Sequence, residues 1–226
     1  MTLTVHSVEQ RSDEWFALRR GIVTASTVGQ LITPSTIKPA NNDKSRGLIA
    51  ALVAERITGW TETTYQSSDM LRGCLDEPVA RQVYPEHTDE PVDECGFMVL
   101  EMGDVRVGYS PDGLVGDDGL IEIKSRTPKS QIPLIVSGEV PAEHIAQVQC
   151  GMYVSGRAWC DYVSFAGGLP LWVKRVHPDP RWFDAIDEAV ANFEAVAAAQ
   201  IDAYRAAVVG LPMTERIDYE TSGIEF

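Results

Sequence analysis

Two short alternating segments on either side of turn residues constrain the fold of this chain more than any other feature. The segments Val105–Tyr109 and Leu120–Lys124 alternate apolar with polar or small residues, which is the period of two expected for β-strands. Between them, Ser-Pro-Asp-Gly (110–113) and Asp-Asp-Gly (117–119) have the composition of turns, and Gly113 is free to take a positive φ. We therefore expect two adjoining strands of a sheet, connected through Asp112.

This stretch carries two carboxylates and one lysine. In the second strand Ile121 and Ile123 share one face, whereas Glu122 and Lys124 share the other. Asp112, Glu122 and the Ile123 carbonyl are hard oxygen ligands of the kind that Mg²⁺ and Mn²⁺ prefer. Lys124 can then orient or deprotonate a water, or counter the charge of a phosphate. An ordinary turn followed by an exposed Glu–Lys ion pair is the alternative, and these residues alone leave it open.

Length and composition limit the possible classes of protein. At 226 residues, we expect one domain over residues 1–206 and a tail over 207–226. There is neither a run of about 18 apolar residues nor a signal-peptide pattern, so a cytoplasmic location without a membrane span is expected. The four cysteines lack zinc or iron–sulfur spacing and are predicted to be reduced thiols. A net charge of −14 disfavours a DNA-binding protein unless metal ions and a local basic groove offset it.

Helical periodicity and cap residues predict the other elements. A helix is expected after Ser12, and the helix over Asp69–Tyr84 should direct Met70, Leu71, Leu75 and Val79 inward. Residues 33–46 and 60–67 are predicted as connections, and residues 125–140 as a loop with a short amphipathic piece. The remaining predictions are helices from Thr24, over Ser45–Gly59, Pro141–Tyr153 and Asp179–Ala206, and strands over Cys95–Leu100, Trp159–Ala166 and Leu171–His177.

Two further groups of residues are candidates for binding. Arg19 lies just before a helix break and Ser26 at the start of the next helix, where free amides and a cation suit a phosphate. Arg20 is the competing arginine, and an ordinary surface arginine with a helix cap is the alternative. His144 and Gln147 lie three residues apart on one helix face, which is expected to point toward a cleft.

Five motifs in one order resemble a known family. They are LRRGIVTAS (18–26), GCLDE (73–77), GYSPDGL (108–114), LIEIKS (120–125) and HIAQVQCGMY (144–153). The set, spread over about residues 12–155, resembles the PD-(D/E)xK nuclease core and more closely the phage lambda exonuclease / YqaJ-like viral recombinase family. The resemblance implies an α/β fold with a restriction-endonuclease-like core, a central mixed β-sheet flanked by α-helices, and a site at one sheet edge.

The resemblance also assigns roles to residues. Glu77 matches the family's additional metal-site carboxylate better than Asp76, which is one position off the motif, and His144 departs from the aromatic residue frequent in relatives. The implied set is Asp112, Glu122, Ile123 and Glu77 for the metals, Lys124 for orienting the water, Gln147 for assistance, and Arg19, Ser26 and Ser110 for the terminal 5′-phosphate.

The activity that the resemblance implies is 5′→3′ digestion of linear double-stranded DNA, which leaves 3′ overhangs for recombination by strand annealing. Two Mg²⁺ ions, or Mn²⁺ as the alternative, would serve each site. Relatives form a trimeric ring and act with a single-strand annealing protein, so we expect a phage- or prophage-encoded homo-oligomer. The alternatives are another PD-(D/E)xK endonuclease, or a non-catalytic DNA-binding or assembly subunit with the same fold.

Overall fold

The strands form two main sheets and one short hairpin in the computed structural model, which describes residues 1–62 and 67–217. The strands are β1 (Thr2–His6), β2 (Val23–Thr24), β3 (Ile32–Thr33), β4 (Lys38–Pro39), β5 (Val92–Asp93), β6 (Phe97–Met102), β7 (Val105–Tyr109), β8 (Gly113–Val115), β9 (Gly119–Ser125), β10 (Trp159–Phe165) and β11 (Trp172–Val176). One sheet has the order β1-β6-β7-β2, the other has the order β11-β10-β9-β8-β5, and β3 pairs with β4. The second sheet is mixed, since β9 is parallel to β10 and antiparallel to β8.

Seven helices occur in the described ranges, and their caps explain most of their starts. They are α1 (Asp13–Arg19), α2 (Ala25–Val28), α3 (Asp43–Thr58), α4 (Ser68–Thr88), α5 (Pro128–Ser137), α6 (Ala142–Ser155) and α7 (Pro180–Ala207). Ser12 caps α1 by accepting a hydrogen bond from the Trp15 amide, as predicted. Asn42 caps α3 with the Ser45 amide, so this helix begins two residues before the predicted start.

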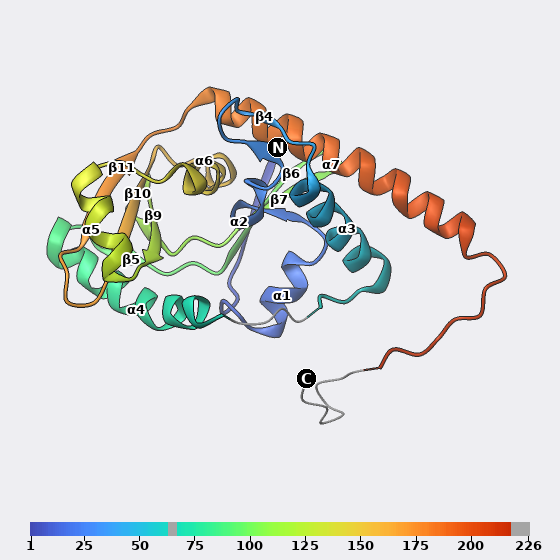
Figure 1. Ribbon diagram of the computed structural model, residues 1–226, viewed down its shortest axis with the longest axis horizontal. Helices are drawn as coiled ribbons and strands as arrows, with labels where there is room; N and C mark the ends of the chain where they lie inside the picture. Colours follow the sequence, from blue (N-terminus) through green and yellow to red (C-terminus); the bar gives the residue numbers. More distant parts are fainter. Residues whose placement is uncertain (63–66, 218–226) are drawn as a thin grey trace.

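Helices cover both faces of the strands that carry the site. Figure 1 shows α4 along one side of β9 and β10 and α6 on the other. Ile121 and Ile123 of β9 pack with Ala80 and Tyr84 of α4. Leu120 points to the opposite face and belongs to the larger core, which also contains buried residues of α6 and α7. The even-numbered residues of β9 therefore face α6, and this side positions the candidate site.

The predicted packing of α4 is wrong. Met70, Leu71, Leu75 and Val79 are exposed, with 47% to 74% of each residue accessible to solvent. The face of α4 that meets the sheet carries polar residues as well as Ala80 and Tyr84; its Arg72, Asp76 and Arg81 bond to Ser125 or to the Asp112 carbonyl. Hydrophobic periodicity failed because this helix turns charged side chains toward the candidate site.

Two predicted loops contain regular structure. Residues 125–140 include the ten-residue helix α5, in which Pro128 occupies the first turn, where no backbone donor is needed. Pro133 lies inside the same helix and obscured its pattern in the sequence. Residues 33–46 include β4 and the start of α3. The predicted connection 60–67 lies partly outside the described residues, at positions 63–66.

The glycine at the end of the Ser-Pro-Asp-Gly segment has a different role from the predicted one. Gly113 is not among the glycines with positive φ; the nearest such glycine is Gly116, with a φ of 50°, in the separate turn between β8 and β9. A Cβ on Gly113 would lie 2.3 Å from Cγ1 of Val92 and 2.9 Å from Cδ1 of Ile121. Gly113 is thus needed for close packing of β8, which holds the preceding Asp112 against β9.

Three further points concern the ends and edges of the fold. Strand β9 lies between β8 and β10, so the site is on an interior strand and the expected position at a sheet edge is wrong.

Regular secondary structure stops at Ala207, and residues 218–226 of the predicted tail lie outside the described ranges; the division into residues 1–206 and a tail stays a prediction. Across the described ranges, no helix has the length and apolar character needed to cross a bilayer.

Candidate active site

Asp112 and Glu122 meet where the two sheets join. Asp112 follows β7 and precedes β8, and its Oδ2 accepts a 2.6 Å hydrogen bond from the Ile123 amide of β9. That bond fixes the carboxylate of a turn residue against the neighbouring strand. Glu122 lies on β9 with only 1% of its surface exposed, so the alternative of an exposed Glu–Lys ion pair does not describe Glu122. Glu122 is therefore held on the α6 side of the sheet, and Asp112 is held against the backbone of the same strand.

Lys124 and Gln147 complete a closed network with Glu122. The Lys124 ammonium donates to Glu122 Oε1 at 2.8 Å and to Gln147 Oε1 at 3.0 Å. Gln147 extends from α6, and its Nε2 donates to the same Glu122 oxygen. Each of the three groups thus contacts the other two. The structure thus brings together two proposed site residues, Lys124 of β9 and Gln147 of α6, which are 23 residues apart in the sequence.

Several carboxylates lie close together in the site, and their negative charges shift the pKa values of Asp112 and Lys124. Burial raises the pKa of Asp112 well above its usual range, and the charges of Glu122 and Glu77 raise this pKa further. The charge of Lys124 and the hydrogen bond from the Ile123 amide lower it, but by less. Burial alone lowers the pKa of Lys124, but the charges of Glu122 and Asp112 outweigh it and the pKa is raised. Lys124 is therefore an ammonium at neutral pH. A protonated lysine orients a water or a phosphate oxygen but does not deprotonate a water.

The chemistry of the donors fits a divalent cation. Glu122 Oε2 is buried and has no hydrogen-bond partner, which is costly for a carboxylate oxygen unless a ligand completes it. Within residues 1–62 and 67–217 no group of three or more His, Cys, Asp or Glu converges as a ready-made metal site. Two carboxylates are nevertheless a common protein contribution to Mg²⁺, with phosphate oxygens and waters as the other ligands.

Glu77 lies on the Asp112 side of the site but is held by arginines. Its carboxylate pairs with Arg81 at 2.5 Å and with Arg11 at 2.8 Å. Glu77 and Asp112 line a common cavity of about 610 Å³. Asp76 instead accepts a 2.6 Å hydrogen bond from Ser125. The preference for Glu77 over Asp76 is consistent with these positions, although Glu77 has to leave its arginines to bind a cation.

Arg19, Ser26 and Ser110 form a second cluster, which we call the anchor cluster. The Arg19 guanidinium donates to Ser110 Oγ at 3.4 Å and to Ser26 Oγ at 3.3 Å. Trp15 donates its indole N–H to Ser110 Oγ at 2.7 Å, and its ring centroid lies 4.0 Å from the Arg19 guanidinium carbon. Burial lowers the pKa of Arg19 to about 10, so the group stays charged at neutral pH. Arg20 Nε is buried without a partner, and Arg19 is the arginine that contacts both serines.

Sequence reasoning missed two residues around this site, Trp15 and Arg126. Trp15 is not among the site residues expected from the sequence, yet it contacts both Ser110 and Arg19 of the anchor cluster. Arg126 lies just beyond the predicted strand, is half-buried and donates to Tyr162 at 2.8 Å. The alternation of β9 contains the signal for Arg126, because positions 122, 124 and 126 share one face of an extended segment. His144, on the helix face expected to point toward a cleft, bonds to Tyr162.

Comparisons with known proteins identify the family and the fold. The model of the YqaJ-like viral recombinase domain matches residues 14–158. The fold is similar to that of an alkaline exonuclease, LHK-Exo, from Laribacter hongkongensis, with 35% identity, a TM-score of 0.78, and coverage of 89% of this chain and 100% of that chain. The structure of LHK-Exo in complex with dAMP matches with the same values.

A more distant solved structure shows the fold alone. A phage related exonuclease from Haemophilus somnus 129PT is 12% identical, with a TM-score of 0.61 and coverage of 83% of this chain and 98% of that chain. None of the curated proteins matches significantly. The predicted mixed α/β fold of the PD-(D/E)xK type and the predicted family resemblance are confirmed.

Proposed function

The chain belongs to the YqaJ-like viral recombinase family, and from that membership we propose that it is a metal-dependent exonuclease that shortens linear double-stranded DNA. One observation carries the proposal: Glu122, Lys124 and Gln147 lie in one contact network, in which the buried Glu122 Oε2 has no partner, and Asp112 is fixed to the neighbouring Ile123 amide. The similarity to an alkaline exonuclease at 35% identity adds support. A binding module has no need for such a carboxylate pair.

We propose Mg²⁺ as the cofactor, with Mn²⁺ as the alternative. Asp112, Glu122 and the Ile123 carbonyl would hold one ion, and Glu77 would serve a second after release from Arg11 and Arg81. When bound, divalent cations supply positive charge at the scissile phosphate. Their arrival would also relieve the repulsion that raises the pKa of Asp112.

The chain's own residues then have separate tasks. The Lys124 ammonium is proposed to hold the attacking water or a phosphate oxygen, since its pKa is raised and it carries its proton. Gln147 has both amide atoms engaged, with Nε2 on Glu122 and Oε1 on Lys124. Its proposed role is therefore to set the distance between these two groups, so that neither moves when substrate arrives.

The anchor cluster supports a direction of digestion. A cation, two hydroxyls and an indole-ordered serine are suited to a phosphomonoester. If Arg19, Ser26 and Ser110 hold a terminal 5′-phosphate, cutting proceeds 5′→3′ and leaves 3′ overhangs. The net charge of −14 is then offset locally, because Arg19 and Lys124 both lie next to the proposed strand path.

Three finer elements of the proposal rest on family membership. They are a trimeric ring, a single-strand annealing protein as partner, and a location in the cytoplasm of a bacterium that carries the phage or prophage. A ring that encloses the duplex would account for processive digestion, since an enclosed strand cannot diffuse away between cuts. Native mass spectrometry of the purified chain tests the ring, and a mass of one chain at micromolar concentration would exclude it.

The decisive experiment compares linear, nicked and closed-circular duplexes, each with and without Mg²⁺. We expect release of mononucleotides from linear DNA only in the presence of Mg²⁺, and faster release from ends that carry a 5′-phosphate. The Asp112→Asn variant is the control for a contaminating nuclease. Cleavage of closed circles by the wild-type protein would instead identify an endonuclease, and binding to DNA without cleavage would indicate a non-catalytic subunit.

A further inference from the structure

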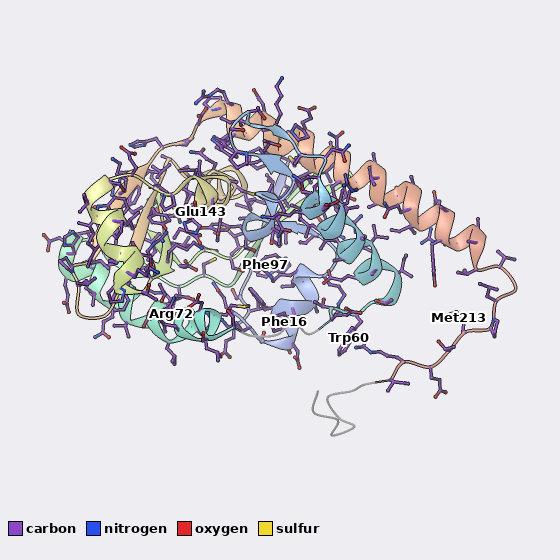
Figure 2. All side chains as sticks on the ribbon, viewed as in Figure 1. Phe16, Trp60, Arg72, Phe97, Glu143 and Met213 are labelled. Carbon is purple, nitrogen blue, oxygen red and sulfur yellow. The ribbon has the colours of Figure 1, made fainter. Side chains whose placement is uncertain are left out.

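A cavity of about 300 Å³ opens beside Lys124, and no residue of the anchor cluster lines it. Its walls come from the end of β9, the start of α5, the first turn of α6 and the start of α4. In Figure 2, Arg72 and Glu143, which line the cavity, lie well to the left of Phe16, a residue of α1 beside the anchor cluster. The cavity is therefore separate from the proposed 5′-phosphate site, although both border the acidic residues.

Arg126 is the unusual residue of this cavity. Its Nη2 donates to the Tyr162 hydroxyl at 2.8 Å and lies 3.4 Å from His144 Nδ1. Neither neighbour carries a negative charge, and Arg126 Nε is buried without a hydrogen-bond partner. The other cations of the cavity are paired, Lys124 with Glu122 and Arg72 with Asp69. A half-buried guanidinium whose described contacts are uncharged is a site for an anion.

The hydrogen bonds around Arg126 determine which nitrogen of His144 carries a proton. A guanidinium can only donate, so the Tyr162 oxygen accepts from Arg126 and its own proton is free. That proton is donated to His144 Nδ1, 2.8 Å away. Burial and the charges of Lys124 and Arg126 lower the pKa of His144 to about 4, so the ring is neutral. A neutral ring that accepts at Nδ1 carries its hydrogen on Nε2.

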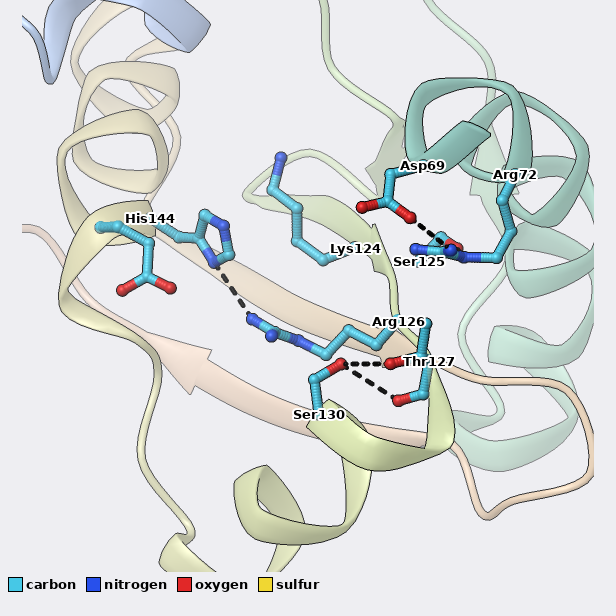
Figure 3. Close-up of a pocket in the computed structure, with 9 residues that line it drawn as sticks. Asp69, Arg72, Lys124, Ser125, Arg126, Thr127, Ser130 and His144 are labelled. Carbon is cyan, nitrogen blue, oxygen red and sulfur yellow. Dashed lines mark hydrogen bonds and ion pairs between the residues drawn. The ribbon is translucent and has the colours of Figure 1, made fainter. Parts of the chain in front are cut away.

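Figure 3 shows the His144 ring beside Arg126, with Lys124 across the same opening. We propose that this cavity is a subsite for a backbone phosphate of the strand being digested, on the 3′ side of the scissile linkage, with Arg126 and the His144 Nε2–H as its donors. The inference rests on the proposed exonuclease function. A strand that is anchored at its 5′ end and cut at Asp112 and Glu122 continues past Lys124, which borders the cavity.

Two carboxylates in the cavity bear on the choice of ligand. Asp69 is occupied by Arg72 at 2.7 Å, and its side chain is largely exposed, so solvent screens it. Glu143 also lines the cavity and raises the pKa of His144, against the larger effects that lower it. A single negative phosphate next to Arg126 is compatible with this balance. A multiply charged group such as a free triphosphate would meet Glu143 without enough cations, so a diester is the better match.

The experiment uses linear duplexes with a 5′-phosphate and one uncharged methylphosphonate linkage. The modification is placed at the first, second or third linkage on the 3′ side of the first cut, and the rate of that cut is measured in a single turnover. In the wild-type protein, one of the first two positions should slow the cut roughly tenfold, as expected for loss of a hydrogen bond to a charged group.

The variants connect this loss to the named residues. His144→Ala and Arg126→Gln should each cut the unmodified duplex more slowly, and the tenfold penalty of the methylphosphonate should shrink to about twofold. His144→Gln keeps an N–H close to the Nε2 position and should retain most of the penalty. A variant that is merely less well folded slows both duplexes equally, so the ratio of the two rates separates binding of the phosphate from a structural role.

The outcomes are distinguishable from failure of the proposed function. If the wild-type protein does not cut unmodified linear DNA with Mg²⁺, the exonuclease proposal is wrong and the subsite falls with it. If it cuts but no methylphosphonate position slows the reaction, the subsite is wrong and the exonuclease proposal stands. An undiminished penalty in both His144→Ala and Arg126→Gln would likewise overturn the subsite.

Discussion

Replacing Asp112 by asparagine should stabilise the metal-free protein while abolishing its proposed activity. The carboxamide keeps an oxygen that can accept the 2.6 Å hydrogen bond from the Ile123 amide, and its volume is nearly that of the carboxylate. What it removes is a buried negative charge near Glu122 and Glu77. The pKa of Asp112 is raised above its ordinary value by burial and by those charges, so ionised Asp112 destabilises the folded state.

The size and sign of the effect follow from this linkage. Below about pH 4 Asp112 is protonated in both folded and unfolded chains, and the variant has no advantage. As the pH rises, the unfolded chain releases the proton first, so the wild-type protein loses stability until its raised folded pKa is passed. Removing a strained functional carboxylate typically adds about 1 kcal/mol. For a chain of this length that corresponds to a rise of about 2–4 °C in Tm at pH 8.

Adding Mg²⁺ should reverse the order of stabilities. A cation that binds the folded wild-type protein at ten times its Kd stabilises it by about 1.4 kcal/mol, whereas the variant has lost one ligand. We therefore expect Mg²⁺ to raise the wild-type Tm above that of Asp112→Asn. Calorimetry at pH 8 gives the Tm of the wild-type protein and of the variant, each in EDTA and in Mg²⁺. Hydrolysis of linear DNA is measured in parallel.

Asp161→Asn is the matched control. Asp161 is buried, whereas Asp112 is half-buried by solvent exposure, and the Asp161 carboxylate is fully satisfied by Arg175 at 2.8 and 2.9 Å and by Tyr84 at 2.7 Å. Its replacement should destabilise the protein by about 2–4 kcal/mol, with or without Mg²⁺. If Asp112→Asn is also less stable than the wild type in EDTA, or if Mg²⁺ stabilises both proteins equally, the account of Asp112 as a strained cation ligand is refuted.

Three further predictions concern the other groups. Lys124→Ala should keep its fold and its Kd for DNA but lower the single-turnover rate by about 10²–10⁴-fold; a rate near that of the wild type would remove lysine from the mechanism. Removing the 5′-phosphate from a duplex should slow its digestion by the wild-type protein more than its digestion by the Arg19→Ala variant. Equal slowing of the two proteins would refute a role of the anchor cluster in binding the 5′-phosphate. Because its pKa is lowered to about 4, the His144 ring should show no NMR titration between pH 5.5 and 8, and a midpoint near 6.5 would contradict its burial between two cations.

The strands around the site were predictable because their signals are local. Alternation over Leu120–Lys124 sets Glu122 and Lys124 on one face of β9 whatever surrounds them. The cap at Ser12 and the length of α7 likewise depend on neighbouring residues only. The exposure of Leu75 on α4 was not predictable in this way, because it depends on which face of the helix a distant sheet requires.

By itself, the sequence determined the chemical groups of the candidate site, their order along the chain and the family, since motif spacing and strand periodicity are properties of the chain. Only the tertiary structure decided that Glu122 is buried with one unpartnered oxygen, that Gln147 joins it to Lys124, and that Arg126 has an imidazole and a phenol as neighbours. Burial and partners arise from contacts between elements 18 to 36 residues apart. The free energies that such contacts determine, and with them protonation and affinity, are therefore set by the packing of distant elements.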